Sequence, residues 1–182
     1  MKKQIELELA WLVKNMPKDL EDCPSFEIVQ GYLPCDDDQI KDERVRKKKG
    51  IFTHTKKRFA VSSQETGFCE EETKKISEGE YLRLMEKGDK KVRKKRYLYP
   101  LESDLIAEID VYKDNLDGLV VVEVEFSDIE GLKKFDPPEW FGKEVTDSLG
   151  VYPPHIANLT FEEVNQINQN YEQKPHDFER KR

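Results

Sequence analysis

Apolar and polar residues alternate with a period of two along most of this chain. The first such segment has an apolar face of Ile5, Leu7, Leu9, Trp11 and Val13, opposite Glu6, Glu8 and Ala10. The same alternation recurs in residues 44–46, 51–56, 69–75, 92–100, 105–112 and 119–126. This period is typical of β-strands whose two faces meet different surroundings. The pattern therefore predicts a chain that is mainly β.

Turn and helix signals separate these segments. Gly50 follows three consecutive lysines and predicts a hairpin turn, in which Lys47, Lys48 and Lys49 are turn charges that could steer an anion. Ser77, with Glu80 three residues later, has the capping-box pattern and predicts a helix over 77–85. Further short helices are expected over 128–135 and, from apolar residues at helical spacing, after residue 160.

Many short strands in one small domain expose sheet edges, and closing the sheet into a barrel removes those edges. We therefore expect a mainly β (α+β) fold, a closed antiparallel β-barrel with short helices packed outside. Residues 1–159 are expected to form this domain, and residues 160–182 a polar C-terminal helix and tail.

The polar faces of the strands carry charged residues far more often than Ser, Thr or Gln. The pairs at alternate positions are Glu6 and Glu8, Arg44 and Arg46, Lys94 and Arg96, Glu108 and Asp110, and Glu123 and Glu125. One interpretation is an ordinary solvated sheet face with weak cross-strand ion pairs. The other is the interior of a barrel, where charges need a partner or a ligand. Such an interior would suit a phosphate compound held by Arg and Lys, with divalent cations held by carboxylates.

Composition narrows the classes of function. The chain has 182 residues, of which 36% are hydrophobic and 38% charged, with a net charge of -7. This balance fits a globular domain and argues against a general nucleic-acid binder, which usually has a basic surplus. The sequence has neither a long apolar run nor a signal-peptide core, so we expect no membrane span. Three cysteines without a CxxC pair are expected to be reduced thiols in the cytoplasm.

An ordered series of motifs resembles the CYTH family of triphosphate tunnel metalloenzymes. The matching segments keep the family's order from residue 6 to about residue 157, and only the whole set is specific. They are Glu6-Leu7-Glu8 with Trp11-Leu12-Val13, Gln30-Gly31-Tyr32-Leu33, Arg44 and Arg46, a strand ending at Lys56, Lys94 with Arg96-Tyr97, Glu108-Ile109-Asp110-Val111-Tyr112, Val122-Glu123-Val124-Glu125-Phe126, and Trp140-Phe141-Gly142-Lys143-Glu144-Val145-Thr146.

The resemblance implies an eight-stranded antiparallel tunnel that binds and hydrolyses a triphosphate with Mg²⁺ or Mn²⁺. It implies phosphate binding by Arg44, Arg46, Lys56, Lys94 and Arg96. It implies metal binding by Glu6, Glu8, Asp110, Glu123 and Glu125. The catalytic positions that it implies are Glu8, Lys56, Arg96 and the position of Ala10. Members of the family are often dimers, so a homodimer is one expected assembly.

Two positions depart from the family pattern. The lysine of the first motif is Ala10 here, which puts the rate of hydrolysis in doubt. The middle acidic motif has two possible registers, with either Glu70 and Glu72 or Glu71 and Thr73 on one face. We favour Glu70 and Glu72, because that register pairs two carboxylates.

Three alternatives to a triphosphatase stay open at this point. A class IV adenylate cyclase uses the same kind of tunnel, but no base pocket is visible in the sequence. Because of Ala10, the tunnel could instead bind triphosphate or polyphosphate without hydrolysing it. The third alternative is a charged barrel without a phosphate site.

Overall fold

Nine β-strands form one antiparallel sheet in the computed structural model, which describes residues 3–34, 40–59, 68–88, 90–146 and 153–170. The strands are β1 (Lys3–Val13), β2 (Ser25–Tyr32), β3 (Ile40–Lys48), β4 (Ile51–Phe59), β5 (Phe68–Lys75), β6 (Lys90–Pro100), β7 (Ile106–Tyr112), β8 (Val120–Glu125) and β9 (Phe141–Glu144). The helices are α1 (Glu78–Lys87), α2 (Ile129–Lys134), α3 (Pro153–Ile156) and α4 (Phe161–Asn170), with 3-10 turns at Leu20–Asp22 and Asp114–Leu116. The expectation of a mainly β fold is confirmed.

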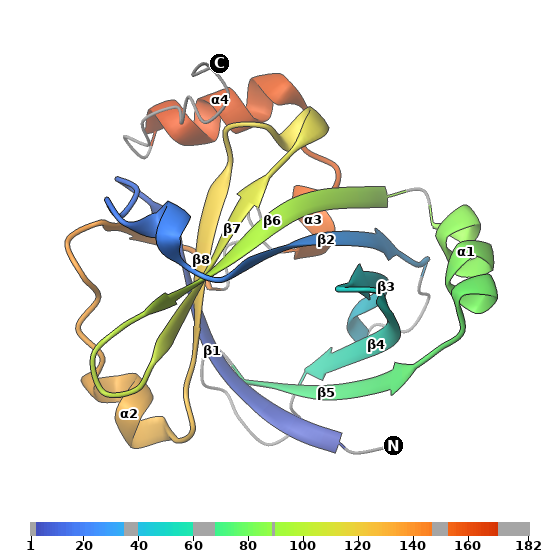
Figure 1. Cartoon of the computed structure of the whole chain (residues 1–182), viewed down its shortest axis with the longest axis horizontal. Helices are drawn as coiled ribbons and strands as arrows, with labels where there is room; N and C mark the ends of the chain where they lie inside the picture. Colours follow the sequence, from blue (N-terminus) through green and yellow to red (C-terminus); the bar gives the residue numbers. More distant parts are fainter. Residues whose placement is uncertain (1–2, 35–39, 60–67, 89, 147–152, 171–182) are drawn as a thin grey trace.

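The strands follow the order β5-β4-β3-β2-β6-β7-β8-β1-β9, and β5 also pairs with β1. Residues 3–7 of β1 pair with β5, and residues 8–12 pair with β8. The series of paired strands that begins at β1 and passes through β8, β7, β6, β2, β3, β4 and β5 therefore returns to β1. Figure 1 shows these strands curving around a common interior. The sheet has one strand more than the eight that the resemblance implies: β1 to β8 make the returning series, and the four-residue β9 is a further partner of β1.

Side-chain packing shows which face of the strands is the outer one. The ring of Phe52 on β4 lies 5.0 Å from that of Tyr81 on α1, and α1 packs on β2, β3 and β4. On the other side of the molecule, an aromatic and aliphatic cluster covers the outer faces of β1, β7 and β8, with Trp11, Ile109, Val122, Val124, Phe126 and Phe141 among its buried residues. The apolar faces thus point outward under helices and loops, and the charged faces point inward.

The predicted helix starts are present. Ser77 caps α1 by accepting a hydrogen bond from the backbone N–H of Glu80 at 3.2 Å. Asp128 caps α2 in the same way, with the N–H of Gly131 at 2.8 Å. No helix within the described residues is long and apolar enough to cross a bilayer.

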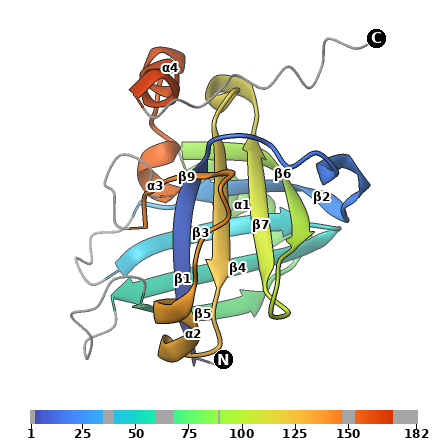
Figure 2. The same cartoon turned by 90° about the vertical axis from the view of Figure 1, so that its left-hand side faces the viewer.

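The C-terminal helices lie over one end of the interior (Figures 1 and 2). Ile156 of α3 and Val164 of α4 are buried in one cluster with Leu12, Tyr112 and Val121 from the inner faces of the strands. The helix predicted after residue 160 is therefore present, and it packs against the strands. Residues 171–182, the rest of the predicted tail, lie outside the described residues.

The segment that resembles the family's closing motif holds the C-terminal half of β1. β9 passes so close to β1 that a Cβ atom on Gly142 would lie 2.7 Å from the backbone oxygen of Leu12. Beyond β9, Val145 donates a backbone hydrogen bond to the carbonyl of Ala10 at 2.7 Å. The Thr146 hydroxyl accepts one from the N–H of Ala10 at 3.1 Å. Only glycine fits position 142 without displacing the β1 backbone.

Candidate functional site

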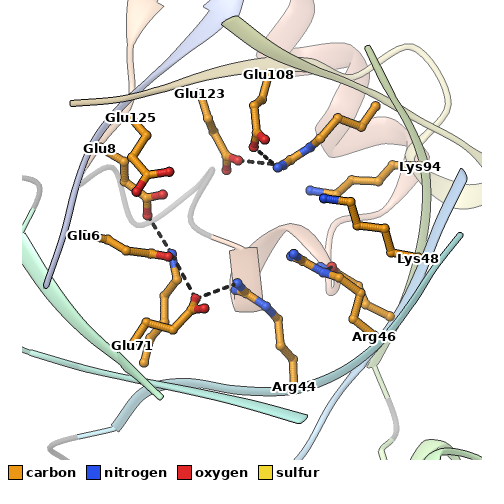
Figure 3. Close-up of a pocket in the computed structure, with 13 residues that line it drawn as sticks. Glu6, Glu8, Arg44, Arg46, Lys48, Glu71, Lys94, Glu108, Glu123 and Glu125 are labelled. Atoms are coloured by element: carbon orange, nitrogen blue, oxygen red, sulfur yellow. Dashed lines mark hydrogen bonds and ion pairs between the residues drawn. The ribbon is translucent and has the colours of Figure 1, made fainter. Parts of the chain in front are cut away.

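A cavity of about 180 Å³ lies inside the ring of strands (Figure 3). Apart from one glutamine, every residue that lines it is charged. The lining consists of Glu6, Glu8, Gln30, Arg44, Arg46, Lys48, Lys57, Glu71, Lys94, Arg96, Glu108, Glu123 and Glu125. These charged residues therefore do not form a solvated outer face, since they share a cavity inside the ring of strands.

The strand pattern gives the cavity two chemically different sides (Figure 3). β3 and β6 supply the basic residues at alternate positions, Arg44, Arg46, Lys94 and Arg96, all of which were predicted. β1, β5 and the end of β8 supply most of the carboxylates. Successive side chains of a strand point to opposite faces, so one strand delivers charges of one sign to the cavity at every second residue.

The basic side is held by buried carboxylates behind it. Lys94 and Arg96 both pair with Asp110, which is fully buried, and Arg96 donates from Nε to Asp110 Oδ1 at 2.7 Å. Arg96 also pairs with Glu108, and with Glu123 at 2.7 Å. Arg44 pairs with Asp42. These contacts fix the directions of the guanidinium groups before any ligand arrives.

Asp110 was predicted to bind metal, but it does not line the cavity. Its carboxylate is occupied by Lys94 and Arg96, and its exposure is 0%. Its place in the structure fits a residue that orients the two bases.

On the acidic side, Glu6, Glu8, Glu71 and Glu125 lie around Lys57, and Glu71 also pairs with Arg44 at 3.5 Å. The Lys57 ammonium lies 2.7 Å from Glu6 Oε2, 2.8 Å from Glu8 Oε1 and 4.0 Å from Glu71 Oε2. Two cations, Lys57 and Arg44, therefore face four carboxylates, which leaves negative charge for a further cation to neutralise.

The predicted Lys56 does not line the cavity, whereas its neighbour Lys57 does. Lys56 pairs at 3.1 Å with Glu43, which does not line the cavity, and 36% of its side chain is exposed. Phe52 packs outward on α1, so the face of β4 that carries Phe52, His54 and Lys56 is the outer one. The inner face is that of Thr53, Thr55 and Lys57.

The structure places Glu71 and Thr73, the alternative register of the middle acidic motif, on the inner face of β5 in place of the favoured Glu70 and Glu72. Lys57 is the direct cross-strand partner of Glu71, and directly opposed residues of neighbouring strands project to the same face. Thr55 and Thr73 confirm this register, since their hydroxyls are 2.7 Å apart. Glu70 and Glu72 belong to the other face of β5, and neither lines the cavity.

Three further lining residues were absent from the predicted site. Gln30 belongs to a motif that was noted, and its Oε1 accepts a hydrogen bond from Arg46 Nε at 3.1 Å. Glu108 shares a strand face with Asp110, so alternation alone could have placed it in the cavity. Lys48 was assigned to a charged turn, although it keeps the spacing of Arg44 and Arg46.

Ala10 lies next to the cavity rather than in its lining. It is the cross-strand partner of Glu123 and packs against the apolar cluster that contains Leu12. A lysine at this position would carry its ammonium group towards the acidic side chains of the same face.

Burial and neighbouring charges shift several pKa values. Burial lowers the pKa of Lys94 to about 8, although Asp110 opposes the shift. Burial, together with Arg44 and Arg96, lowers the pKa of Arg46 to about 10. Burial also disfavours the Lys57 ammonium, but Glu8 and Glu6 outweigh it and raise the pKa of that lysine.

The carboxylates on the two sides shift in opposite directions. Burial and then Glu6 and Glu8 raise the pKa of Glu125. Glu123 has a lowered pKa, because Arg96 and Lys94 outweigh the effect of burial. Like charges therefore crowd Glu125, whereas Glu123 is already neutralised by bases. In the described part of the chain no three acidic, His or Cys side chains form a ready-made metal cluster.

Comparison with known proteins decides the family. No family model matches the sequence. An inorganic triphosphatase from Nitrosomonas europaea is 32% identical over 142 residues, which cover 78% of this chain and 89% of that protein. The chain belongs to the CYTH family of triphosphate tunnel enzymes. The resemblance read from the motifs is thus confirmed by a relative that matches most of the CYTH chain.

Solved structures agree with this assignment. The crystal structure of the inorganic triphosphatase NE1496 superposes on the CYTH chain with a TM-score of 0.61 and 28% identity, covering 84% of this chain and 97% of that one. The PH1012 protein from Pyrococcus horikoshii OT3 matches with a TM-score of 0.52 and 18% identity, over 87% and 93% of the two chains. The second likeness shows a shared fold alone.

Proposed function

We propose that this CYTH protein hydrolyses inorganic triphosphate, or a similar triphosphate, inside its charged cavity with the help of Mg²⁺ or Mn²⁺. The observation that carries the proposal is the division of one cavity inside the ring of strands into a basic side and an acidic side. A triphosphate complexed with divalent metal has the matching division, with anionic oxygens along the chain and cations bound to them. The return of the strand pairing to β1 supports a closed tunnel around that ligand.

The basic side would hold the phosphate chain. Arg44, Arg46, Lys94 and Arg96 present donors to the cavity, and arginine can grip phosphate oxygens with two parallel hydrogen bonds. Carboxylate partners hold Arg44, Lys94 and Arg96 in place, so these three side chains lose little freedom on binding.

The acidic side would hold the metal. Carboxylate oxygens are the ligands that Mg²⁺ and Mn²⁺ prefer, and Glu6, Glu8, Glu71 and Glu125 offer them around a single lysine. Burial and then repulsion from Glu6 and Glu8 raise the pKa of Glu125, and a bound cation would relieve that repulsion. Glu123 remains a proposed metal ligand at the edge of this group, although one of its carboxylate oxygens pairs with Arg96. When bound, the metal neutralises charge on the phosphate oxygens and lowers the pKa of a coordinated water.

Charge balance supports the need for metal. The cavity lining has six carboxylates (Glu6, Glu8, Glu71, Glu108, Glu123 and Glu125) and six cations (Arg44, Arg46, Lys48, Lys57, Lys94 and Arg96), so its formal charges cancel. A multiply charged anion would enter a site without a surplus of positive charge. Added divalent cations would supply that surplus.

In the proposed reaction, water adds to the terminal phosphorus as the P–O bond to the remaining diphosphate breaks. Arg96 and Lys57 would stabilise charge on the transferring group, with Lys57 replacing the predicted Lys56. Glu8 accepts a hydrogen bond from Lys57 at 2.8 Å and would help to keep the ammonium directed into the cavity.

Ala10 favours a second candidate, a CYTH domain that binds triphosphate without turning it over. The family lysine is absent at this position, and the alanine methyl adds no charge to the cavity. An adenylate cyclase is less well supported. The lining in the described part of the chain has no apolar or aromatic side chain on which a base could stack.

The test is phosphate release from inorganic triphosphate, ATP and thiamine triphosphate with Mg²⁺ or Mn²⁺, measured for the wild type and for Ala10→Lys. We expect hydrolysis of inorganic triphosphate that is faster in Ala10→Lys by about tenfold or more. Activity in the variant alone would support the non-catalytic candidate for the natural chain. If neither protein binds or hydrolyses any of the three compounds, the proposed function is wrong.

A further inference from the structure

Lys48 is the last residue of β3, next to the β3–β4 turn, and its side chain lines the cavity. Figure 3 shows it pointing into the cavity alongside the other bases. Arg44, Arg46 and Lys48 occupy alternate positions of one strand and therefore share its inner face. Same-face neighbours on a strand are about 6.6 Å apart along it, so Lys48 extends the row of cations beyond Arg46 by one such step.

The bases of the cavity differ in their partners. Arg44, Lys57, Lys94 and Arg96 each pair with at least one carboxylate. Within the described ranges, Arg46 and Lys48 have no carboxylate in ion-pair contact: Arg46 donates to the amide of Gln30, and the Lys48 ammonium lies 4.5 Å from the centre of the Phe26 ring. These two cations are therefore the positive charge that a ligand is free to neutralise.

The surroundings of Lys48 indicate repulsion in the absence of a ligand. Burial lowers the pKa of Lys48, and Arg96, Arg46 and Lys49 lower it further. An anion between Lys48 and Arg46 would remove that repulsion. The face of the Phe26 ring stabilises the ammonium beside the cavity without neutralising it.

A solvated lysine in a turn would not have this geometry. Lys47 and Lys49 flank Lys48 and are exposed, and neither lines the cavity. Lys49 is a close internal comparison, because its ammonium also lies 4.5 Å from the Phe26 ring centre. The two lysines share the charge and the aromatic contact, and they differ in access to the cavity.

We infer that Lys48 is a further phosphate-binding residue of the cavity, and that with Arg46 it forms a subsite for one phosphoryl group of an inorganic oligophosphate beside the β3–β4 turn. This inference rests on the proposed function. Lys48 lies on the basic side and contributes binding more than chemistry, so its loss should raise KM and change kcat little.

The experiment compares Lys48→Gln with the matched control Lys49→Gln and with the conservative variant Lys48→Arg. Binding of inorganic triphosphate with Mg²⁺ is measured by calorimetry, and KM and kcat by phosphate release. We expect Lys48→Gln to weaken binding and raise KM by about tenfold, Lys49→Gln by less than about twofold, and Lys48→Arg to restore the wild-type values. All three variants should melt as the wild type does, since the side chain ends in the cavity.

The outcomes separate the two proposals. If the wild type binds triphosphate and Lys48→Gln behaves like Lys49→Gln, Lys48 is only a turn charge and the inference is overturned. A fall in kcat without a change in KM would also overturn it. If the wild type binds no triphosphate at all, the proposed function fails and the subsite fails with it.

Discussion

Single residues in this cavity depend strongly on the charges around them. Lys94 is the clearest case, because it is buried and shares Asp110 with Arg96. One carboxylate thus serves two cations, and burial keeps the pKa of Lys94 at about 8, below the usual value for a lysine. A bound phosphate would supply the missing negative charge and raise this pKa.

The affinity for triphosphate should therefore fall as the pH rises above about 8. Below that pH, free Lys94 is already charged and binding takes up no proton. Above it, binding must first protonate the lysine, so each further pH unit costs up to about tenfold in affinity. Calorimetric binding of inorganic triphosphate on either side of pH 8 measures the effect.

Lys94→Arg is the matched variant, because arginine keeps its charge throughout this range. We expect the affinity of this variant for triphosphate to stay constant above about pH 8, where the affinity of the wild type falls. The same decline in both proteins would show that another group titrates.

At the scale of elements, the pairing of β4 with β5 decides which charges enter the cavity. Both strands have charged residues at adjacent positions, so their sequences allow either face to be the inner one. Because Phe52 packs on α1, the opposite face of β4, which carries Lys57, is the inner one. The cross-strand pairing of Lys57 with Glu71 then places Glu71 on the inner face of β5. A shift of one residue would exchange every inner side chain of a strand.

Lys57→Gln should therefore impair function where Lys56→Gln does not. We expect Lys57→Gln to lower kcat/KM for triphosphate at least about tenfold, because it removes the ammonium group that contacts both Glu6 and Glu8 in the cavity. Lys56 lies outside the cavity, so its variant should stay within about twofold of the wild type. Phosphate release at matched protein stability measures both.

Glu71→Gln and Glu70→Gln give the corresponding pair on β5. Weaker Mg²⁺ binding is expected for Glu71→Gln alone. If the two lysine variants had equal effects on activity, or the two glutamate variants equal effects on Mg²⁺ binding, the assigned inner faces of β4 and β5 would be contradicted.

At the scale of the whole molecule, the fold joins two kinds of interior. One end is apolar, where α3 and α4 cover Leu12, Tyr112 and Val121, and the rest is the charged cavity. Burying this many charges is costly, and their mutual pairing offsets only part of that cost. A ligand that completes the pairing should therefore stabilise the entire fold.

Triphosphate with Mg²⁺ should raise the melting temperature more than triphosphate or Mg²⁺ alone, because only the complex fits both sides of the cavity. Ligand at about a hundred times its Kd adds about 2.7 kcal/mol to the free energy of unfolding. Thermal unfolding with and without a chelator measures the shift. An equal shift from triphosphate alone would argue against the proposed metal site.

The sequence by itself determined the strand-rich fold, the family, and the strands that carry each sign of charge. Alternation places Arg44 and Arg46, or Glu6 and Glu8, on one face whatever the rest of the chain does, since the period of a strand is local. The helix starts at Ser77 and Asp128 were equally predictable, because a cap is formed within a few residues.

Only the tertiary structure decided which face is the inner one where charges are adjacent. Lys56 and Lys57 are chemically alike, and nothing in the local sequence distinguishes them. The contacts of β4 with α1 and β5 decide which of the two lysines points into the cavity. Asp110 and Glu108 share a face, yet contacts from Lys94 and Arg96 leave Asp110 behind the lining while Glu108 lines the cavity. Lys48 became a cavity residue because β3 continues to the turn with its inner face unchanged. The depth of each side chain, its ion-pair partners and the choice of inner face all depend on packing between segments that are distant in the sequence. The alternation along a single strand carries no information about that packing.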